Sequence, residues 1–340
     1  MSSLPADPFR DVVGHAAVRR LLSGQLASGR LSHAYLLVGE PSLGKMTVAR
    51  ALASALLPEA PLERHPDYWE DDHPGALKVD EIRLIPEKGP ERHEQTLQSF
   101  LAMKPRVGAY RVAVVGTVGR IPDTYQNLLL KTLEEPHPNR VVVLTTPSLS
   151  PFVVLPTVVS RCQRLSFRPV PLPEIVELLR RRGLPEDRAQ TLAALSRGRP
   201  GWALRAACDE GIVERGRHWE QRLEEVFGAP EDVPLTLAAE LDGARSEWRG
   251  GRRSPIPPDL RASDPGALAD PAAPDDPVQF ALGCWQLLLR RKMLRDPSSR
   301  DGARWARLLE LSYDTLGYLE QNVSPRLALE CFLLACRSVS

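Results

Sequence analysis

The stretch Gly39-Glu-Pro-Ser-Leu-Gly-Lys-Met-Thr47 has the spacing of a phosphate-binding loop (P-loop), G-x-x-x-x-G-K-[ST]. In such a loop the glycines let backbone N–H groups surround phosphate oxygens, and the lysine reaches the terminal phosphates. Gly39, Gly44 and Lys45 are therefore the candidate nucleotide-binding residues. An apolar run at 34–38 precedes the loop and apolar residues at helical spacing follow it, which predicts a strand, the loop and then a helix.

The loop lacks one part of its pattern. Met46 stands where a serine or threonine hydroxyl would ligate magnesium. Magnesium takes oxygen ligands in near-octahedral geometry, and a thioether cannot replace them. Thr47 comes one residue late, about a third of a helical turn away, so its hydroxyl is expected to point elsewhere. The sequence therefore predicts a degenerate, non-functional P-loop.

A second part of the metal site is also missing. A working P-loop NTPase places acids at the end of the second strand, where they hold the magnesium shell and activate water. Here the strand at 111–115 is followed by Gly116 and Thr117, and the next carboxylate is Asp123. The two losses together predict that the chain hydrolyses no ATP by itself, and we expect neither a bound metal nor a cofactor.

Strand and helix patterns alternate from the P-loop onward. Strand-like apolar runs occur at 34–38, 111–115 and 141–145, and a fourth is expected at 165–167. Helical patterns between them predict a parallel sheet with helices on both faces, whereas residues 57–75 read as irregular. From about residue 169 the pattern is helical, apart from 250–277, where recurring prolines predict a flexible loop. The predicted fold is an α/β P-loop domain followed by all-helical regions.

Composition narrows the class of protein. A chain of 340 residues is long enough for two or three domains, and its net charge of +1 gives no global field for nucleic acid. The five cysteines include no C-x-x-C pair, which argues against a disulfide framework or a zinc site, and we expect Cys331 and Cys336 to be core thiols. Between residues 57 and 75 only His65 and His73 could ligate zinc, and both read as surface histidines. With no apolar signal or membrane segment, a cytoplasmic protein is expected.

The tripeptide Ser160-Arg161-Cys162 allows two interpretations. Arg161 could be a loop arginine on a solvated face. It could also be an arginine finger, a cation offered to a phosphate in a neighbouring subunit's site. The second interpretation gains weight because the chain has no working site of its own for Arg161 to serve. The nearby stretch Lys131-Thr-Leu-Glu-Glu-Pro136 reads as a helix end with capping and surface charge.

Several stretches together point to a known family. With these stretches in this order, the chain resembles the delta-prime branch of the AAA+ clamp-loader family of bacterial DNA polymerase III. The matching stretches span nearly the whole chain: Ser32-His-Ala-Tyr-Leu-Leu-Val-Gly39, Gly44-Lys45, Asn127-Leu-Leu-Leu-Lys-Thr-Leu-Glu-Glu-Pro136, Ser160-Arg-Cys162 and Asn322-Val-Ser-Pro-Arg-Leu-Ala-Leu-Glu330.

The resemblance implies an AAA+ domain at 1–168, a helical lid at 169–211 and a helical collar at 212–340. The collar would join the chain to tau/gamma-type ATPase subunits and a delta-type subunit in a hetero-pentamer. That complex would load a sliding clamp on primed DNA, with Arg161 reaching the ATP of an adjacent subunit. The family's four-cysteine zinc module is not expected, because residues 57–75 hold no cysteine. Two alternatives stay open: a weakly active P-loop ATPase motor subunit that uses the Thr47 hydroxyl or a noncanonical acid, and a scaffold in which Arg161 is structural.

Overall fold

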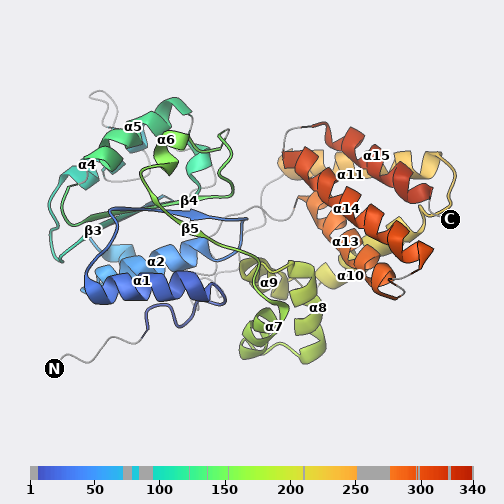
Figure 1. Ribbon diagram of the computed structural model, residues 1–340, viewed down its shortest axis with the longest axis horizontal. Coiled ribbons are helices and arrows are strands. Elements are labelled where there is room, and N and C mark those ends of the chain that lie inside the picture. The colour runs from blue at the N-terminus through green and yellow to red at the C-terminus, as the bar shows by residue number, and fades with distance from the viewer. Residues whose placement is uncertain are drawn as a thin grey trace. The chain divides into compact units, whose positions relative to one another are not determined.

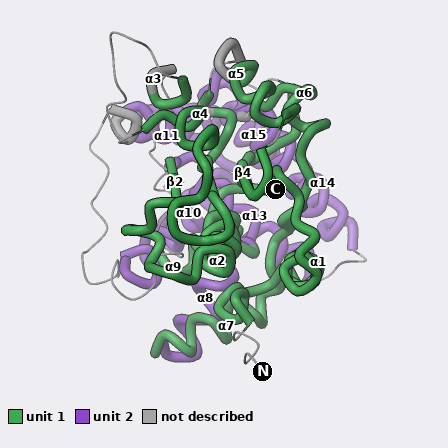
Figure 2. The backbone as a smooth tube through the Cα atoms, turned by 90° about the vertical axis from the view of Figure 1, so that its left-hand side faces the viewer, with its two compact units in different colours: residues 1–183, 198–205, 257–272 green, residues 184–197, 206–256, 273–340 purple. Residues whose placement is uncertain are grey.

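The computed structural model divides the chain into two compact units, coloured separately in Figure 2. Within the described residues, the first unit holds 7–183 and 198–205, and the second holds 184–197, 206–250 and 276–338. The structure describes, with gaps, residues 7–71, 79–83, 95–121, 123–135, 137–151, 153–209, 211–250, 276–295, 297, 299–320 and 323–338. Among these, only the backbone is described for 79, 80, 120, 123–125, 247–250 and 320.

The first unit is built on a parallel sheet, as predicted, but the sheet has five strands where the sequence predicted four. Its strand order is β2-β3-β4-β1-β5, and every recorded pairing is parallel. The strands are β1 (Ala34–Val38), β2 (Tyr68–Asp71), β3 (Arg111–Val115), β4 (Arg140–Thr146) and β5 (Gln163–Ser166). Because all strands run the same way, their carboxyl ends share one edge of the sheet and their amino ends share the other.

Helices cover both faces of this sheet, as Figure 1 shows. Successive side chains of a strand point to opposite faces, so β1 contributes Tyr35 and Leu37 to one core and Ala34 and Leu36 to the other. The first core lies under α1 (Ala16–Ser28) and α2 (Lys45–Leu56), and the second lies under α4 (Leu97–Ala102), α5 (Asp123–Glu134) and α6 (Pro156–Val159). Short helical pieces at η1 (Leu62–Arg64), α3 (Val79–Ile82) and η2 (Val118–Arg120) complete this part of the chain.

The predicted lid is divided between the two units. Helix α7 (Leu172–Arg181) and most of α9 (Pro200–Ala207) lie in the first unit, whereas α8 (Glu186–Ser196) lies in the second. The boundaries at 168 and 211 stay a prediction. The predicted loop at 250–277 falls, for residues 251–275, outside the described residues.

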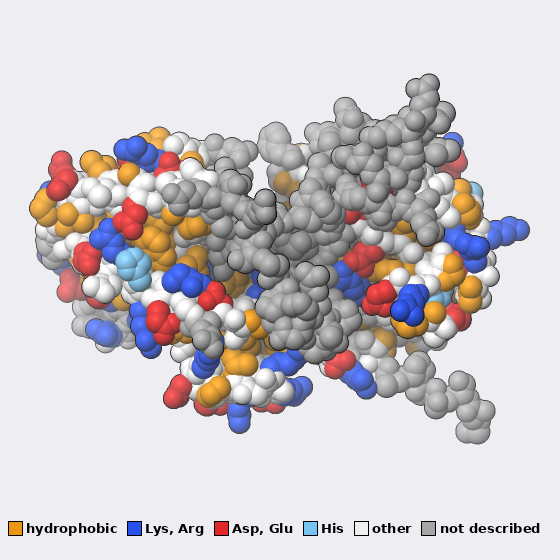
Figure 3. All heavy atoms as spheres, turned by 180° about the vertical axis from the view of Figure 1, so that it is seen from behind, with side chains coloured by type: hydrophobic (Ala, Val, Ile, Leu, Met, Phe, Trp, Pro, Cys, Tyr) orange, Lys and Arg blue, Asp and Glu red, His pale blue; other side chains and the backbone are white. Residues whose placement is uncertain are grey.

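The second unit is helical. Its remaining helices are α10 (Ile212–Glu224), α11 (Asp232–Gly250), α13 (Pro277–Arg295), α14 (Arg300–Glu320) and α15 (Pro325–Arg337). Trp285 of α13 stacks on Phe332 of α15 at 5.7 Å between ring centroids, and its Nε1 donates to the Trp219 carbonyl at 2.6 Å. None of the helices within the described residues is both long and apolar enough to cross a membrane. Basic and acidic side chains are interspersed over the described surface seen in Figure 3.

Three expectations from the sequence are wrong. Residues 57–75 are not irregular throughout, because β2 forms a strand at one end of the sheet. His65 is not a surface residue, since its side chain is only 4% exposed, and His73 lies outside the described residues. Cys336 is a core thiol, but Cys331 is exposed. Five positions on a helix turn through about 140° beyond a full turn, so the two thiols cannot share one buried face.

Candidate functional site

The P-loop lies at the carboxyl edge of the sheet, between β1 and α2, as the sequence predicts. At Gly39 a Cβ atom would lie 2.6 Å from the Phe167 carbonyl oxygen, so only glycine fits this close approach. Gly44 caps α2 in the left-handed region with φ 91°. Ser42 also has a positive φ, 66°, a conformation that costs a residue with a side chain about 1–2 kcal/mol.

Lys45 is turned onto the loop itself. Its side chain is 4% exposed, and Nζ donates to the carbonyl oxygens of Gly39 and Glu40 at 2.7 Å each. In a nucleotide-bound P-loop this ammonium would instead face the terminal phosphates. The lysine therefore already neutralises carbonyl dipoles of its own loop.

The position that should ligate magnesium belongs to the hydrophobic core. Met46 is 2% exposed and is a member of the core beneath α1 and α2. At the end of β3, the backbone N–H of Thr117 donates to Thr145 Oγ1 at 2.8 Å. Among the strands, β2 is the one that ends in a carboxylate, Asp71, and it lies three strand spacings from β1, or roughly 14 Å. These side chains do not fit a magnesium-bound nucleotide, since none offers an oxygen ligand at the position of Met46.

Two other segments of the same unit contact the P-loop. From α9, the Gly201 N–H donates to the Ser42 carbonyl at 3.0 Å, and Arg205 Nη2 donates to Ser42 Oγ at 2.6 Å. Before α1, His15 Nε2 donates to the Leu43 carbonyl at 2.8 Å. Burial lowers the pKa of His15, although that hydrogen bond opposes the shift, so the ring is neutral at pH 7. The loop is thus held by contacts within its own chain.

Arg161 lies at the opposite edge of the sheet. It follows α6 and comes two residues before Gln163, which begins β5 and pairs with Tyr35 of β1. The P-loop begins at the other end of β1, and a five-residue parallel strand is about 16 Å long. An arginine side chain does not span that length, so the structure does not bring Arg161 to the chain's own P-loop.

The guanidinium of Arg161 is held by its own chain. Nη2 forms an ion pair with Glu134 Oε1 at 2.5 Å, and Nη1 donates to the Thr157 carbonyl at 2.8 Å and to Ser160 Oγ at 3.3 Å. The Arg161 side chain is one-third exposed. The sequence reading of residues 131–136 as capping and surface charge missed this role of Glu134.

Motifs that are far apart in the sequence meet at this amino edge. Tyr35 Oη donates to Gln25 Oε1 at 2.8 Å, and Gln25 Nε2 donates to Gln163 Oε1 at 3.0 Å. His33 Nε2 lies 3.1 Å from the Leu133 carbonyl at the end of α5. The segments around residues 32–35, 127–136 and 160–162 are therefore joined through hydrogen bonds next to Arg161.

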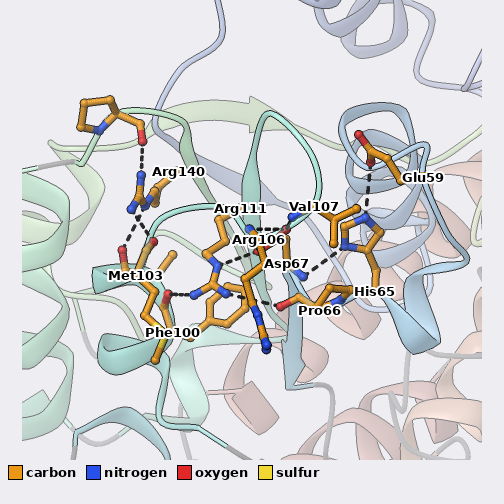
Figure 4. A network of polar contacts seen from close by, with 12 residues as sticks. Glu59, His65, Pro66, Asp67, Phe100, Met103, Arg106, Val107, Arg111 and Arg140 are labelled. Carbon is orange, nitrogen blue, oxygen red and sulfur yellow. Dashed lines mark hydrogen bonds and ion pairs between the residues drawn. The ribbon is translucent and has the colours of Figure 1, made fainter.

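A second polar network, drawn in Figure 4, lies at the amino ends of β2 and β3. The Asp67 carboxylate pairs with Arg111 and accepts the backbone N–H groups of Arg106 and Val107. The Asp67 N–H donates to His65 Nδ1 at 3.1 Å, which explains why this histidine is buried. His65, Pro66 and Asp67 of this network lie within residues 57–75, the stretch where the family's zinc module was not expected because it holds no cysteine. Within the described residues, no group of three His, Cys, Asp or Glu side chains could hold a metal ion.

The parallel sheet, the P-loop after β1 and the flanking helices define a P-loop domain. Residues 14–171 match the sequence family described as DNA polymerase III, delta subunit. About half of the chain is also homologous to gamma and tau subunits of DNA polymerase III.

Individual relatives show how far this similarity extends. The DNA polymerase III subunit tau of Bacillus subtilis (strain 168) is 30% identical over 184 residues, covering 49% of this chain and 30% of that protein. The gamma/tau subunit of Mycobacterium tuberculosis (strain ATCC 25618 / H37Rv) is 32% identical over 171 residues, covering 48% and 29%. The chain thus matches less than a third of the length of these relatives. A solved gamma subunit-related protein from Thermotoga maritima aligns with a TM-score of 0.46 and 21% identity, covering 94% of this chain and 99% of that chain.

Proposed function

We propose that this chain is a delta-prime-type subunit of the DNA polymerase III clamp loader. It hydrolyses no ATP itself and assembles in the cytoplasm with tau/gamma-type ATPase subunits and a delta-type subunit into a hetero-pentamer. That complex opens a sliding clamp and loads it on primed DNA. The contribution of this chain to the chemistry is Arg161, which it offers to the nucleotide of a neighbouring ATPase subunit. The match of residues 14–171 to the DNA polymerase III delta subunit family, and the homology of about half of the chain to a tau subunit, support membership of such a complex.

One observation carries the proposal: the P-loop and Arg161 lie at opposite edges of a single parallel sheet. At the carboxyl edge, Lys45 holds backbone carbonyls and Met46 belongs to the core, which argues against hydrolysis in this chain. At the amino edge, the Arg161 side chain is partly exposed. An arginine that cannot serve its own chain's phosphate loop is suited to a partner's.

The second candidate is a weakly active ATPase motor subunit. It would need an acid close to the P-loop to position magnesium and water. Asp71 ends a strand at the correct edge of the sheet, but it lies roughly 14 Å from β1. Thr47 is half-buried on α2 and one residue beyond the ligand position. Both observations favour the non-catalytic role.

The collar part of the proposal concerns the helices of residues 212–340. Leu327 and Leu334, which are seven positions apart on α15, are 55% and 38% exposed, and they offer an apolar strip that suits a subunit interface. Chains truncated after residue 211 should therefore no longer co-purify with partner subunits.

The test is reconstitution of the complex with and without this chain. The purified chain should show no ATP turnover above background, and adding it to the ATPase and delta-type subunits should restore DNA-stimulated hydrolysis and clamp loading. Arg161→Ala should assemble normally and lower both. Magnesium-dependent turnover by the chain alone that is lost in Lys45→Ala would favour the motor reading instead. Full-rate clamp loading with Arg161→Ala would favour the alternative in which the chain is a scaffold and Arg161 is structural.

A further inference from the structure

The Arg161 guanidinium lies between the carboxyl ends of two helices. Glu134 is the last residue of α5, and the Thr157 carbonyl belongs to α6. Nη2 lies 2.5 Å from the Glu134 carboxylate, and Nη1 lies 2.8 Å from the Thr157 oxygen. The two partners therefore bind the two terminal nitrogens of the guanidinium, and together they fix the orientation of the Arg161 side chain.

Electrostatics favour this arrangement. The carboxyl end of a helix carries partial negative charge, so a glutamate there is unfavourable unless a cation lies beside it. Arg161 supplies that cation to Glu134 and at the same time donates to the Thr157 carbonyl of α6. The neighbouring Glu135 is exposed and has no recorded side-chain contact among the described residues.

The backbone that carries Arg161 is fastened to α5 as well. Gln126 of α5 is 1% exposed, and its Oε1 accepts the Leu155 N–H at the start of α6, 2.9 Å away. Its Nε2 donates to the Val153 carbonyl at 3.2 Å. Helix α6 is therefore tied to α5 at its beginning by Gln126 and at its end by the Glu134–Arg161 pair.

We propose that Glu134 is a positioning residue for Arg161, holding the guanidinium ready for a nucleoside triphosphate bound by the neighbouring subunit. This inference rests on the proposed function, because it needs Arg161 to act in trans. Free arginine side chains lose rotamer freedom when they bind, whereas one already held by a carboxylate and a carbonyl has lost it beforehand. Glu134 does not touch the nucleotide in this scheme. It acts only by keeping the guanidinium in place.

The experiment uses the reconstituted complex and defines the Arg161-dependent rate as the wild-type rate minus the Arg161→Ala rate. Glu134→Ala should lose at least about nine-tenths of that rate, since small misplacements of a reacting group cost roughly 10- to 100-fold. Glu134→Gln keeps an acceptor oxygen without the charge and should lose less. The loss should fall on kcat and not on the KM for ATP, because the partner subunit holds the ATP. The matched control is Glu135→Ala, which should keep the full rate.

Two further measurements separate positioning from structure. The double variant Glu134→Ala/Arg161→Ala should match Arg161→Ala alone, because Glu134 has no other route to the chemistry. Melting temperatures of the variant chains should equal that of the wild type. If Glu134→Ala keeps or raises the rate while Arg161→Ala loses it, the positioning role is wrong and the proposed function stands. If Arg161→Ala itself keeps the full rate, the proposed function and this inference fall together.

Discussion

Arg111 Nε lies 3.0 Å from Asp67 Oδ1, and both side chains are fully buried (Figure 4). The guanidinium also donates to the Phe100 carbonyl at 2.6 Å and lies 4.4 Å from the centre of the Phe100 ring. The carboxylate in turn accepts two backbone N–H groups at 2.8 Å, from Arg106 and Val107. Each charge is thus fully compensated, and loss of either partner would leave the other charge buried and unpaired.

Asp67→Ala is therefore expected to lower the free energy of unfolding of the P-loop domain by about 3–5 kcal/mol at pH 7. Urea unfolding measures this change. Asp11→Ala removes a carboxylate that is 83% exposed in an ion pair with Arg10, and it serves as the control with little expected effect. Replacing the pair by Asp67→Leu and Arg111→Met together should cost less than the single change. Equal losses of unfolding free energy in Asp67→Ala and Asp11→Ala would contradict this prediction.

The same pair predicts how stability depends on pH. Burial opposes ionisation of Asp67, but hydrogen bonds from Val107, Arg106 and Arg111 and the Arg111 charge together hold its pKa below the usual value. A lowered carboxyl pKa stabilises the folded state above the ordinary aspartate pKa of about 4, and this stabilisation is lost as the pH falls further. The stability difference between wild type and Asp67→Asn should thus be largest near pH 7 and should shrink below about pH 4. A pH-independent difference would show that ionisation of Asp67 contributes nothing.

Substitution of Lys45 distinguishes a loop that is stabilised by its own hydrogen bonds from a loop that binds nucleotide. Because Nζ already donates to two carbonyls, Lys45→Met should lower the free energy of unfolding by about 1.5–3 kcal/mol without any ligand. The exposed Lys104 provides the matched change, Lys104→Met, which should be nearly neutral. Millimolar magnesium-ATP should leave the wild-type melting temperature unchanged, since a bound ligand would raise it. A rise in wild type that disappears in Lys45→Met would mean that the loop binds nucleotide.

Conservative and non-conservative changes at Arg161 should behave alike. Lysine keeps the charge but lacks the planar fork of donors, so Arg161→Lys should lose nearly as much ATPase and clamp loading as Arg161→Ala. An arginine finger contributes roughly 10³–10⁵ in rate at the site that it serves. Total hydrolysis in the complex should fall only in part, because other sites keep their own arginines, while clamp loading should fall further. Full activity with lysine would mean that only the charge matters.

The second unit offers a test of what holds α11 to α13. Arg245 and Asp276 form an ion pair at 2.5 Å, each side chain is 8% exposed, and they flank residues 251–275 in the sequence. Asp276 Oδ1 also accepts the Val278 N–H at the start of α13. Arg245→Met should cost about 3–5 kcal/mol in thermal or urea unfolding. The sequence predicts a flexible loop over these residues, and replacing 251–275 by a shorter Gly/Ser linker should then change stability by about 1 kcal/mol or less, because loop-closure entropy varies slowly with length.

The sequence predicted the elements whose signals are local. The strands at 34–38, 111–115 and 141–145 are apolar throughout, and the structure has them within a residue at either end. β2 was missed because two of its four residues, Glu70 and Asp71, are acidic, so it shows no apolar run. Glu70 is accommodated by Arg50 from α2, a partner that lies 20 residues away in the chain.

The sequence named candidate site residues but could not give their geometry. Spacing alone identified Gly39, Gly44 and Lys45, and the structure assembles them into one loop. Spacing could not show that Lys45 faces its own carbonyls, nor that Glu134 pairs with Arg161, because these contacts depend on how β1, α5 and α6 pack. His65 was read as exposed for the same reason, since its burial follows from Asp67 and Glu59.

The close approach of Gly39 to the Phe167 carbonyl affects how P-loop motifs are interpreted in other sequences. A Cβ there would collide with the Phe167 oxygen, and Gly44 needs its positive φ to begin α2. Lys45 is likewise retained by two carbonyls of its own loop. Packing, backbone conformation and hydrogen bonds within the domain thus favour the residues of the pattern G-x-x-x-x-G-K without any bound nucleotide. Searches that count this motif as a sign of ATP use will therefore include proteins that keep it only as a way of joining a strand to a helix.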